Sequence, residues 1–195
     1  MDFDGAKEFI LEKLARELKP ELKYHSLDHT LDVLESATRI GTLENVNGHD
    51  MELLKTAALF HDSGMLIQYT GHEEASTTLT EKYLPDFGYT DDEIAAINSM
   101  IMTTKLPQSA RSQLEMILCD ADLDYLGRDD FFMIAHRLQY EWNKLGVYPT
   151  TLRKWYELQL QFLGNHEYFT DAAKSTRNEF KAKNVAQVKE LLLKL

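Results

Sequence analysis

Apolar residues recur every three to four positions along most of the chain, which is the spacing that places them on one face of an α-helix. Runs in which Val or Ile alternate with polar residues are absent, so we expect no strand. Caps and the breaks at proline and glycine set the expected helix bounds. The pattern predicts a first helix that ends near Pro20 and further helices at about 26–41, 50–61, 73–84, 91–104, 109–121, 129–145, 150–164, 170–182 and 184–194. We therefore predict an all-α fold, built as a compact multi-helix bundle.

Three of these helices have informative patterns. In the second, the expected apolar stripe runs through Leu27, Leu31, Leu34, Ala37 and Ile40. His29 lies within this stripe and is expected to point inward or to its edge. The third, MELLKTAALFHD, is apolar on nearly every side and is expected to be buried. Thr90 followed by Glu93 forms a capping-box pattern, which supports the start of the fifth helix.

Composition narrows the classes of partner. The 195 residues suffice for one domain with a substantial core. Lys and Arg number 21 against 32 Asp and Glu, a formal charge of −11, so we do not expect a basic face that tracks nucleic acid. A small anionic partner is compatible with this charge if a metal ion and local cations offset the global field.

The cysteine count and the distribution of apolar residues indicate the cellular compartment. The single cysteine, Cys119, lies in an apolar run, where we expect a buried thiol, and it excludes an intrachain disulfide. The N-terminal stretch has no signal-peptide pattern, and no apolar run approaches the ~20 residues that span a bilayer. We therefore expect a cytoplasmic protein without a membrane partner.

His61 and Asp62 are the most informative polar pair, because they end the most hydrophobic predicted helix. Burying both side chains is costly unless a metal ion or hydrogen bonds satisfy them. The alternative is a structural histidine at a helix end.

Two further clusters carry candidate ligands. In CDADLDYLG, three aspartates are two positions apart, so on a helix they point in different directions and at most one binds a given ion: Asp120, Asp122 and Asp124. The other two would face solvent or support the ligand. The segment lacks the glycine and glutamate of a calcium loop. In YHSLDHTLDV, His25 and His29 are four apart and can share a helix face, or can be one capping and one core histidine.

Together, the clusters follow the order H … HD … D on three separate predicted helices and resemble the HD-domain superfamily of metal-dependent phosphohydrolases. The segments YHSLDHTLDV, AALFHDSGML and ILCDADLDYLG each resemble a local signature of that family. The resemblance covers about 25–127. It implies a single HD-type helical domain over 1–195, with the motif core at about 22–127 and C-terminal helices over 128–195.

The resemblance also implies a metal site whose ligands are His29, His61, Asp62 and Asp122. Asp122 is preferred among the three aspartates because an alanine precedes it and a leucine follows it, as in the family. Two imidazoles with two carboxylates suit one divalent ion, such as Mn, Fe, Ni, Co, Zn or Mg, and leave positions for water and a phosphoryl oxygen.

One ion is our first choice, and a second ion near His72 is left open. His72 resembles a histidine that holds a second metal in some branches of the superfamily, but Thr103 and Thr104 stand where those branches have another histidine. His72 would then contact the substrate or the metal water, or would simply begin a helix.

Catalytic roles are assigned by the same resemblance. In related cyclic nucleotide phosphodiesterases a histidine four positions before the first ligand donates a proton, and His25 has that place here; a structural role is the alternative. Asp62 or Glu73 would orient the attacking water. Lys105 is the best-placed cation for a phosphate and is expected to act in catalysis as well, and we expect Thr104 beside it to contact the substrate. Lower-ranked cations are Arg111, Arg128, Arg177 and Lys181. Residues 168–170 would stack on a base or pack in the core.

The expected function is metal-dependent hydrolysis of a phosphate ester or anhydride of a small anionic substrate, in the first instance a nucleotide. One alternative is a metal-stabilised regulatory module without turnover. Another is a di-iron HD oxygenase, against which the missing later histidine argues. A homodimer is left open.

Overall fold

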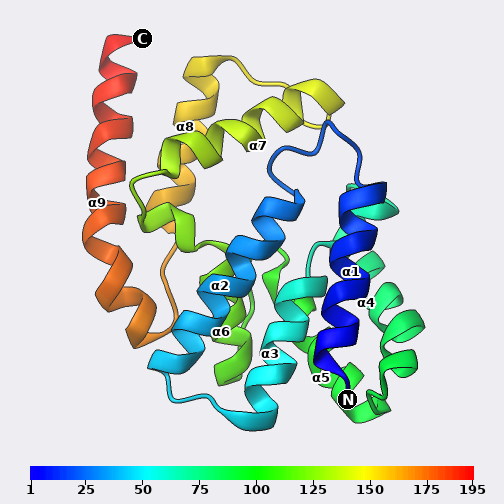
Figure 1. Ribbon diagram of the computed structural model, residues 1–195. Coiled ribbons are helices and arrows are strands. Elements are labelled where there is room, and N and C mark those ends of the chain that lie inside the picture. Colours follow the sequence, from blue (N-terminus) through cyan, green and yellow to red (C-terminus); the bar gives the residue numbers. More distant parts are fainter. The chain divides into compact units, whose positions relative to one another are not determined.

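The computed structural model describes all 195 residues and is all-α, as the periodicity predicts. No strand interrupts its nine α-helices and three short 3-10 helices (Figure 1). The α-helices are α1 Phe3–Glu17, α2 Leu27–Leu43, α3 Gly48–Phe60, α4 His72–Tyr83, α5 Asp91–Thr104, α6 Gln113–Asp122, α7 Phe131–Leu145, α8 Leu152–Asn165 and α9 Asp171–Lys194. The 3-10 helices are η1 Ser63–Leu66, η2 Leu84–Phe87 and η3 Asp124–Gly127. No helix is both long and apolar enough to cross a membrane.

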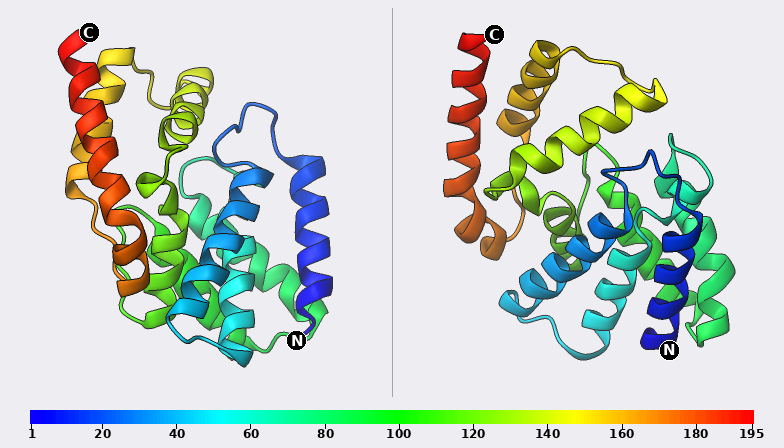
Figure 2. Two further views of the ribbon diagram at one scale, coloured as in Figure 1. Left: turned by 60° about the vertical axis from the view of Figure 1, so that its left-hand side comes forward. Right: turned by 45° about the horizontal axis from the view of Figure 1, so that its top comes forward.

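The chain divides into two packed units. The first contains Met1–Lys19 and His25–Asp122, and the second contains Pro20–Tyr24 and Leu123–Leu195. In the first unit α2 lies alongside α3 and α6, and α3 also packs against α5 (Figure 1 and Figure 2). The last eight residues of α3 are buried apart from Lys55, as its apolar pattern predicts. This helix therefore delivers His61, the residue that follows it, into the interior, where it is 1% exposed.

The buried face of α2 differs from the expected stripe. Leu31 is 41% exposed, so its predicted place on the inward face was wrong. The buried positions instead include His29, Val33, Ala37 and Ile40, at intervals of four, four and three residues. Residues two positions apart on a helix point in different directions, so the inward position of His29 turns Leu31 toward solvent. The prediction that His29 points inward is confirmed, since it is 8% exposed.

Helix starts follow local hydrogen bonds. The capping box of Thr90 and Glu93 is present in both directions, which confirms that prediction. The helix expected at 109–121 begins only at Gln113, because the carboxylate of Glu115 accepts hydrogen bonds from the backbone amides of Arg111 and Ser112. The carboxylate thus accepts hydrogen bonds from N–H groups that precede the helix and have no partner within it.

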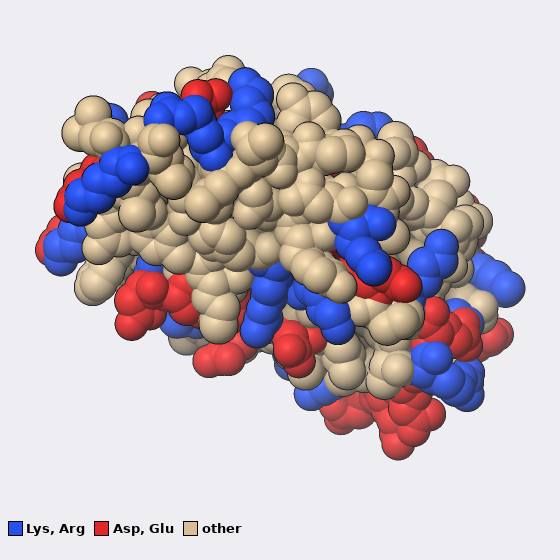
Figure 3. All heavy atoms as spheres, turned by 90° about the horizontal axis from the view of Figure 1, so that it is seen from above, with Lys and Arg blue, Asp and Glu red and all other residues tan.

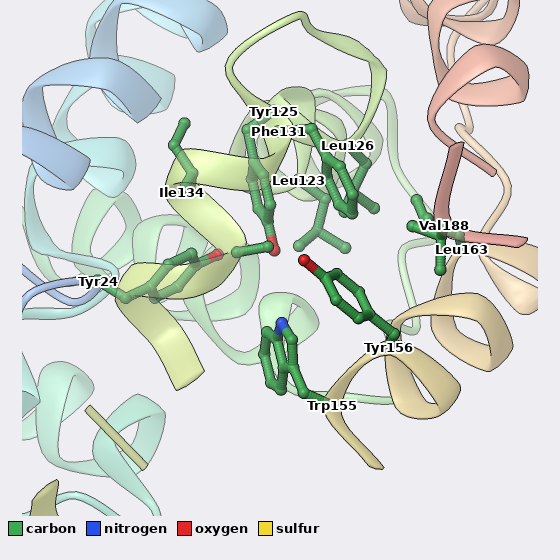
Figure 4. Close-up of a cluster of buried hydrophobic side chains, with 11 residues drawn as sticks. Tyr24, Leu123, Tyr125, Leu126, Phe131, Ile134, Trp155, Tyr156, Leu163 and Val188 are labelled. Carbon is green, nitrogen blue, oxygen red and sulfur yellow. The ribbon is translucent and has the colours of Figure 1, made fainter. Parts of the chain in front are cut away.

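The second unit is organised around a cluster of buried aromatic and aliphatic side chains. Trp155 and Tyr156 of α8 point toward Phe131 of α7 and toward residues of η3 (Figure 4). The short segment Pro20–Tyr24 joins this unit through the amide of Tyr24, which donates a hydrogen bond of 2.9 Å to the buried carboxylate of Glu141.

The C-terminal helix is longer than expected. The predicted helices 170–182 and 184–194 form the single helix α9, so the break between them was wrong. No glycine or proline lies in this stretch. Asn184, which could favour a break, instead donates its side-chain amide to the carbonyl oxygens of Leu126 and Arg128 and is buried against η3.

Candidate metal centre

The His61–Asp62 pair lies where α3 ends and the chain turns into η1. The Nδ1 atom of His61 donates a hydrogen bond of 2.7 Å to the carbonyl oxygen of Ala58. Because a carbonyl oxygen can only accept, this bond places the proton of the neutral imidazole on Nδ1 and leaves the lone pair of Nε2 for a metal ion. The turn thus presents His61 in the tautomer that a ligand needs.

Helix α4 holds this turn in place through residues that the sequence analysis did not single out as part of the site. The hydroxyl of Ser76 donates to the carbonyl oxygen of His61 at 2.7 Å and accepts from the amide of Gly64 at 2.8 Å. A Cβ atom on Gly64 would overlap the carbonyl oxygen of His72 and would lie 2.6 Å from the amide nitrogen of Ser76. Only glycine allows this close approach, and a glycine two residues after the HD pair was the available signal.

Four predicted ligands come together. The Nε2 atoms of His29 and His61 are 3.4 Å apart, and Asp122 Oδ1 lies 3.2 Å and 3.7 Å from them, respectively. Asp62 Oδ2 lies 3.2 Å from His61 Nε2 and 3.5 Å from His29 Nε2. The side chains come from α2, from the end of α3 and from the end of α6, so the three helices meet at one point as the sequence order suggested.

This cluster fits a divalent cation. Asp62 Oδ2 is buried and accepts no hydrogen bond. His61 donates its Nδ1 proton to Ala58, so the lone pair of its Nε2 faces the two carboxylate oxygens. Groups that can only accept hydrogen bonds and lie this close together need a cation or an added proton between them. Two imidazoles with two carboxylates are the donor set of borderline divalent metals.

When no metal ion is bound, an added proton lies between His61 and the neighbouring carboxylates. Burial alone would lower the pKa of His61, but the charge of Asp62, followed by that of Asp122, raises it to about 9. Burial alone would raise the pKa of Asp62, yet the nearby charges of His61 and His25 hold it well below its usual range. Asp62 is therefore a carboxylate throughout the neutral pH range.

The other oxygen of Asp62 belongs to a second cluster. Asp62 Oδ1 lies 3.2 Å from His72 Nε2, and His72 Nδ1 donates to the carbonyl oxygen of Tyr69 at 2.9 Å. Ligand atoms of His25, Asp62 and His72 lie within 4.8 Å of one another. Burial would lower the pKa of His72, but its pairing with Asp62 and the charge of Glu73 raise it to about 9.

Residues at the end of α5 lie outside both clusters. The hydroxyls of Thr103 and Thr104 donate to the carbonyl oxygens of Met100 and Ile101. The Nζ atom of Lys105 forms an ion pair with Glu74 of α4, in which both side chains are about half exposed. Lys105 is thus joined to α4, the helix that begins at His72. Its hydrogen bond to Glu74 raises the pKa of Lys105, and the charge of Glu73 raises it further by a smaller amount.

The aspartates beside Asp122 are buried. Asp120 and Asp124 are 0% and 1% exposed, so the alternative that they face solvent was wrong. In the second unit, Asp124 binds the guanidinium of Arg177 through two hydrogen bonds of 2.7 Å. Arg177 is therefore held in an ion pair inside this unit, because the neighbouring carboxylate needs a partner there.

The remaining candidates are accounted for by local contacts. Arg128 binds Asp130 through two hydrogen bonds, and Lys181 lies over the ring of Tyr168. Tyr168 is buried and donates toward the carbonyl oxygens of Leu123 and Asp124, which confirms the core-packing alternative. Cys119 is buried as expected, and burial raises the pKa of its thiol to about 12. The side chain of Arg111 is exposed.

Charged side chains are mixed on the face drawn in Figure 3. Lys and Arg are interspersed with Asp and Glu there and form no continuous basic field.

Comparisons with known proteins point to one family. The HD domain pattern matches residues 26–124, just over half of the chain. An uncharacterized protein of Clostridium beijerinckii is 36% identical over 81 residues, which is 40% of this chain and 51% of that protein. The match thus spans about half the length of that relative.

Three solved structures share the fold. A protein from an uncultured Thermotogales bacterium, described as a predicted HD superfamily hydrolase, is 19% identical with a TM-score of 0.63, over 98% of this chain and 91% of its own. Bacillus subtilis YpgQ, solved in complex with ADP, is 19% identical with a TM-score of 0.64, over 96% of each chain. A Lactobacillus plantarum protein is 20% identical with a TM-score of 0.69, over 100% of both chains.

The matched pattern includes all four converging side chains, and the fold is shared over nearly the full length. The chain therefore belongs to the HD-domain superfamily, a family of the metal-dependent phosphohydrolase type.

Proposed function

We propose that the protein hydrolyses a phosphate ester or anhydride of a small anionic substrate, in the first instance a nucleotide, with one divalent ion held by His29, His61, Asp62 and Asp122. The observation that carries this proposal is the buried convergence of two Nε2 atoms and two carboxylate oxygens, one of which accepts no hydrogen bond. A divalent ion at this point would polarise a phosphoryl oxygen and lower the pKa of a water molecule.

The substrate class has separate support. YpgQ, whose fold this chain shares, was solved in complex with ADP, and a nucleotide phosphate has the negative charge that a dication attracts. With a net charge of −11, the protein would otherwise repel such a substrate. The metal centre therefore also serves to bind the substrate.

We assign substrate contacts to the open side of the centre. His72 is 17% exposed at its side chain, and Lys105 lies next to the same helix terminus. Thr104 is buried and donates its hydroxyl proton to Ile101, so it offers a phosphate no donor. We therefore assign phosphate contact to His72 and Lys105, and no longer to Thr104.

Proton handling would involve three side chains. Asp62 stays ionised and could orient the attacking water, with Glu73 as the alternative because its Oε1 lies 3.6 Å from His72 Nε2. With one ion bound, His25 is our candidate for the proton donor to the leaving group. Its ring lies edge-on to that of Tyr69, with centroids 5.5 Å apart, which fixes its orientation.

The test combines metal analysis with a turnover screen. Elemental analysis of the purified protein, followed by phosphate release from a nucleotide panel with Mn²⁺, Co²⁺, Ni²⁺ and Mg²⁺, should give at least one metal-dependent activity. His61→Ala should lower that activity by at least about 100-fold. His49→Ala is the matched control, because its exposed imidazole lies at the start of α3, pairs with Glu93 of α5 and belongs to neither cluster.

Two outcomes contradict the proposal in different ways. A bound metal ion without phosphate release from any nucleotide would support the regulatory-module alternative. Equal activity of the His61→Ala and His49→Ala proteins would show that the cluster does not carry the reaction.

A further inference from the structure

The cation that we assign to phosphate contact already has an anion beside it. Lys105 follows α5, and its Nζ atom donates a hydrogen bond to Oε1 of Glu74, in the first turn of α4. The two residues are 31 positions apart in the chain, so their ion pair depends on the packing of α4 against α5. Glu74 also lies two residues after His72, the other residue that we assign to phosphate contact.

Two neighbouring carboxylates lie near these cations, and they differ in how easily they can be displaced. Oε1 of Glu73 lies 3.6 Å from Nε2 of His72, and Glu73 is only 9% exposed. The side chains of Glu74 and Lys105 are each 47% exposed. Because water screens the charges of a half-exposed ion pair, such a pair breaks readily. A bound phosphate can therefore replace Glu74 more easily than Glu73.

The carboxylate of Glu74 interacts with the same groups that a phosphate would contact. The hydrogen bond from Lys105 lowers the pKa of Glu74, and the charge of His72 lowers it further by a smaller amount. Carboxylate and phosphate oxygens both accept charge-assisted hydrogen bonds from an ammonium group. The ammonium group has three donors, but a phosphate that bound Lys105 beside Glu74 would face a like charge. The two anions therefore oppose each other at Lys105.

We propose that Glu74 competes with phosphate for Lys105 and thereby weakens the binding of both the substrate and the phosphate product. This inference rests on the proposed hydrolysis and on the assignment of Lys105, and it adds a residue that regulates that site. Because Glu74 is part of the chain, its carboxylate is present beside Lys105 at a high effective concentration. It returns to the ammonium group whenever a phosphate leaves.

The alternative is an ion pair that only fastens α4 to α5. Glu74→Gln separates the two roles, because the amide keeps the length of the side chain and can still accept a hydrogen bond from Lys105, but has no charge. If the pair only positions Lys105, its loss should weaken phosphate binding or leave it unchanged. If Glu74 competes with phosphate, its neutralisation should strengthen phosphate binding.

The test measures the binding of inorganic phosphate to Mn²⁺-loaded protein by isothermal titration calorimetry. Glu74→Gln should bind phosphate at least about threefold more tightly than wild type, because no carboxylate has to be displaced and none repels the ligand. Glu81→Gln is the matched control, since this exposed carboxylate of α4 accepts a hydrogen bond from the neutral amide of Asn98. It loses the same charge and should keep the wild-type affinity. In a Lys105→Gln background, Glu74→Gln should have no effect.

Three results would overturn the inference. Unchanged, weaker or undetectable phosphate binding in the Glu74→Gln protein would show that the carboxylate does not compete. An equal gain in the Glu81→Gln protein would assign the effect to net charge alone. A gain that persists in the Lys105→Gln background would show that Glu74 does not act through Lys105. Tighter phosphate binding in Glu74→Gln, without phosphate release from any nucleotide, would support the competition while contradicting the proposed hydrolysis.

Discussion

The hydroxyl of Ser76 donates a hydrogen bond of 2.7 Å to the carbonyl oxygen of His61, so α4 fixes the backbone of this proposed metal ligand. The same hydroxyl accepts from Gly64, on the other side of Asp62. Ser76 therefore spans the turn that carries both His61 and Asp62. It is fully buried.

Removing this hydroxyl should loosen the turn. Ser76→Ala leaves a buried amide and a buried carbonyl without their partner, which costs about 1–3 kcal/mol of the free energy of unfolding. Metal affinity should fall by about 10-fold, because His61 is no longer held in register. Urea denaturation and Mn²⁺ titration measure the two effects. Thr78→Ala is the control, since this exposed hydroxyl of the same helix bonds only within α4. Equal behaviour of the two variants would contradict the role of Ser76.

Gly64 should tolerate no side chain. In Gly64→Ala, the new methyl group would overlap the backbone of His72 and Ser76, both of which belong to α4. We expect a loss of more than about 3 kcal/mol in the free energy of unfolding, or loss of the folded state. Gly164→Ala is the matched control, because nothing lies within 4 Å of its Cβ position in α8. That change should stabilise the protein by about 0.5–1 kcal/mol. Thermal unfolding of both proteins decides the comparison.

The sequence was informative where local chemistry determines structure. Helix periodicity and caps located nearly every element, and the order of H, HD and D placed His29 and His61 close to Asp122. On α2 the inward position of His29 was predicted correctly, but Leu31 was wrongly placed on the same face, where the structure has Val33 instead. The continuity of α9 was missed because Asn184 finds its hydrogen-bond acceptors in η3, far away in the sequence. The position of Asp62 between His61 and His72 depends on how α4 packs against η1, which spacing alone does not encode.

Metal binding should depend on pH. Because the metal-free protein raises the pKa of His61 and His72 to about 9, both are protonated at pH 7, and an ion must displace those protons. Affinity for Mn²⁺ should therefore increase with pH up to about 9. The raised pKa values also stabilise the metal-free fold, because the folded protein binds these two protons more tightly than the unfolded chain does. This stabilisation is complete below pH 6.5, the pKa of a histidine in the unfolded chain, and is lost as the pH rises through about 9.

Calorimetry can detect the displaced protons. Titration of Mn²⁺ at pH 7.0 in buffers with different ionisation enthalpies should show release of protons on binding. Wild-type and His49→Ala proteins should release equal numbers, because that exposed imidazole lies outside both clusters. Binding without proton release, or with an affinity that is constant between pH 6.5 and 8.5, would disprove protonated ligands in the metal-free state.

The Cys119 thiol should be inert in the folded protein. Burial raises its pKa to about 12, and its Sγ donates to the carbonyl oxygen of Thr103. Only the thiolate reacts with aromatic disulfide reagents. We expect no labelling of native protein at pH 8 and complete labelling of one thiol per chain in denaturant. Rapid labelling of the native protein would show that the α5–α6 contact opens readily.

Asp122 and Asp124 should have opposite mutational effects although they lie two residues apart. Asp122→Asn replaces a proposed ligand at the edge of the centre, so Mn²⁺ affinity should fall by at least about 100-fold while the metal-free protein unfolds at nearly the wild-type denaturant concentration. Asp124→Asn removes the buried partner of Arg177, so the free energy of unfolding should fall by about 3–5 kcal/mol while the folded fraction still binds Mn²⁺. Arg177→Ala should reproduce the second pattern and not the first. If Asp124→Asn abolished metal binding in protein that remained folded, the choice of Asp122 among the three aspartates would be wrong.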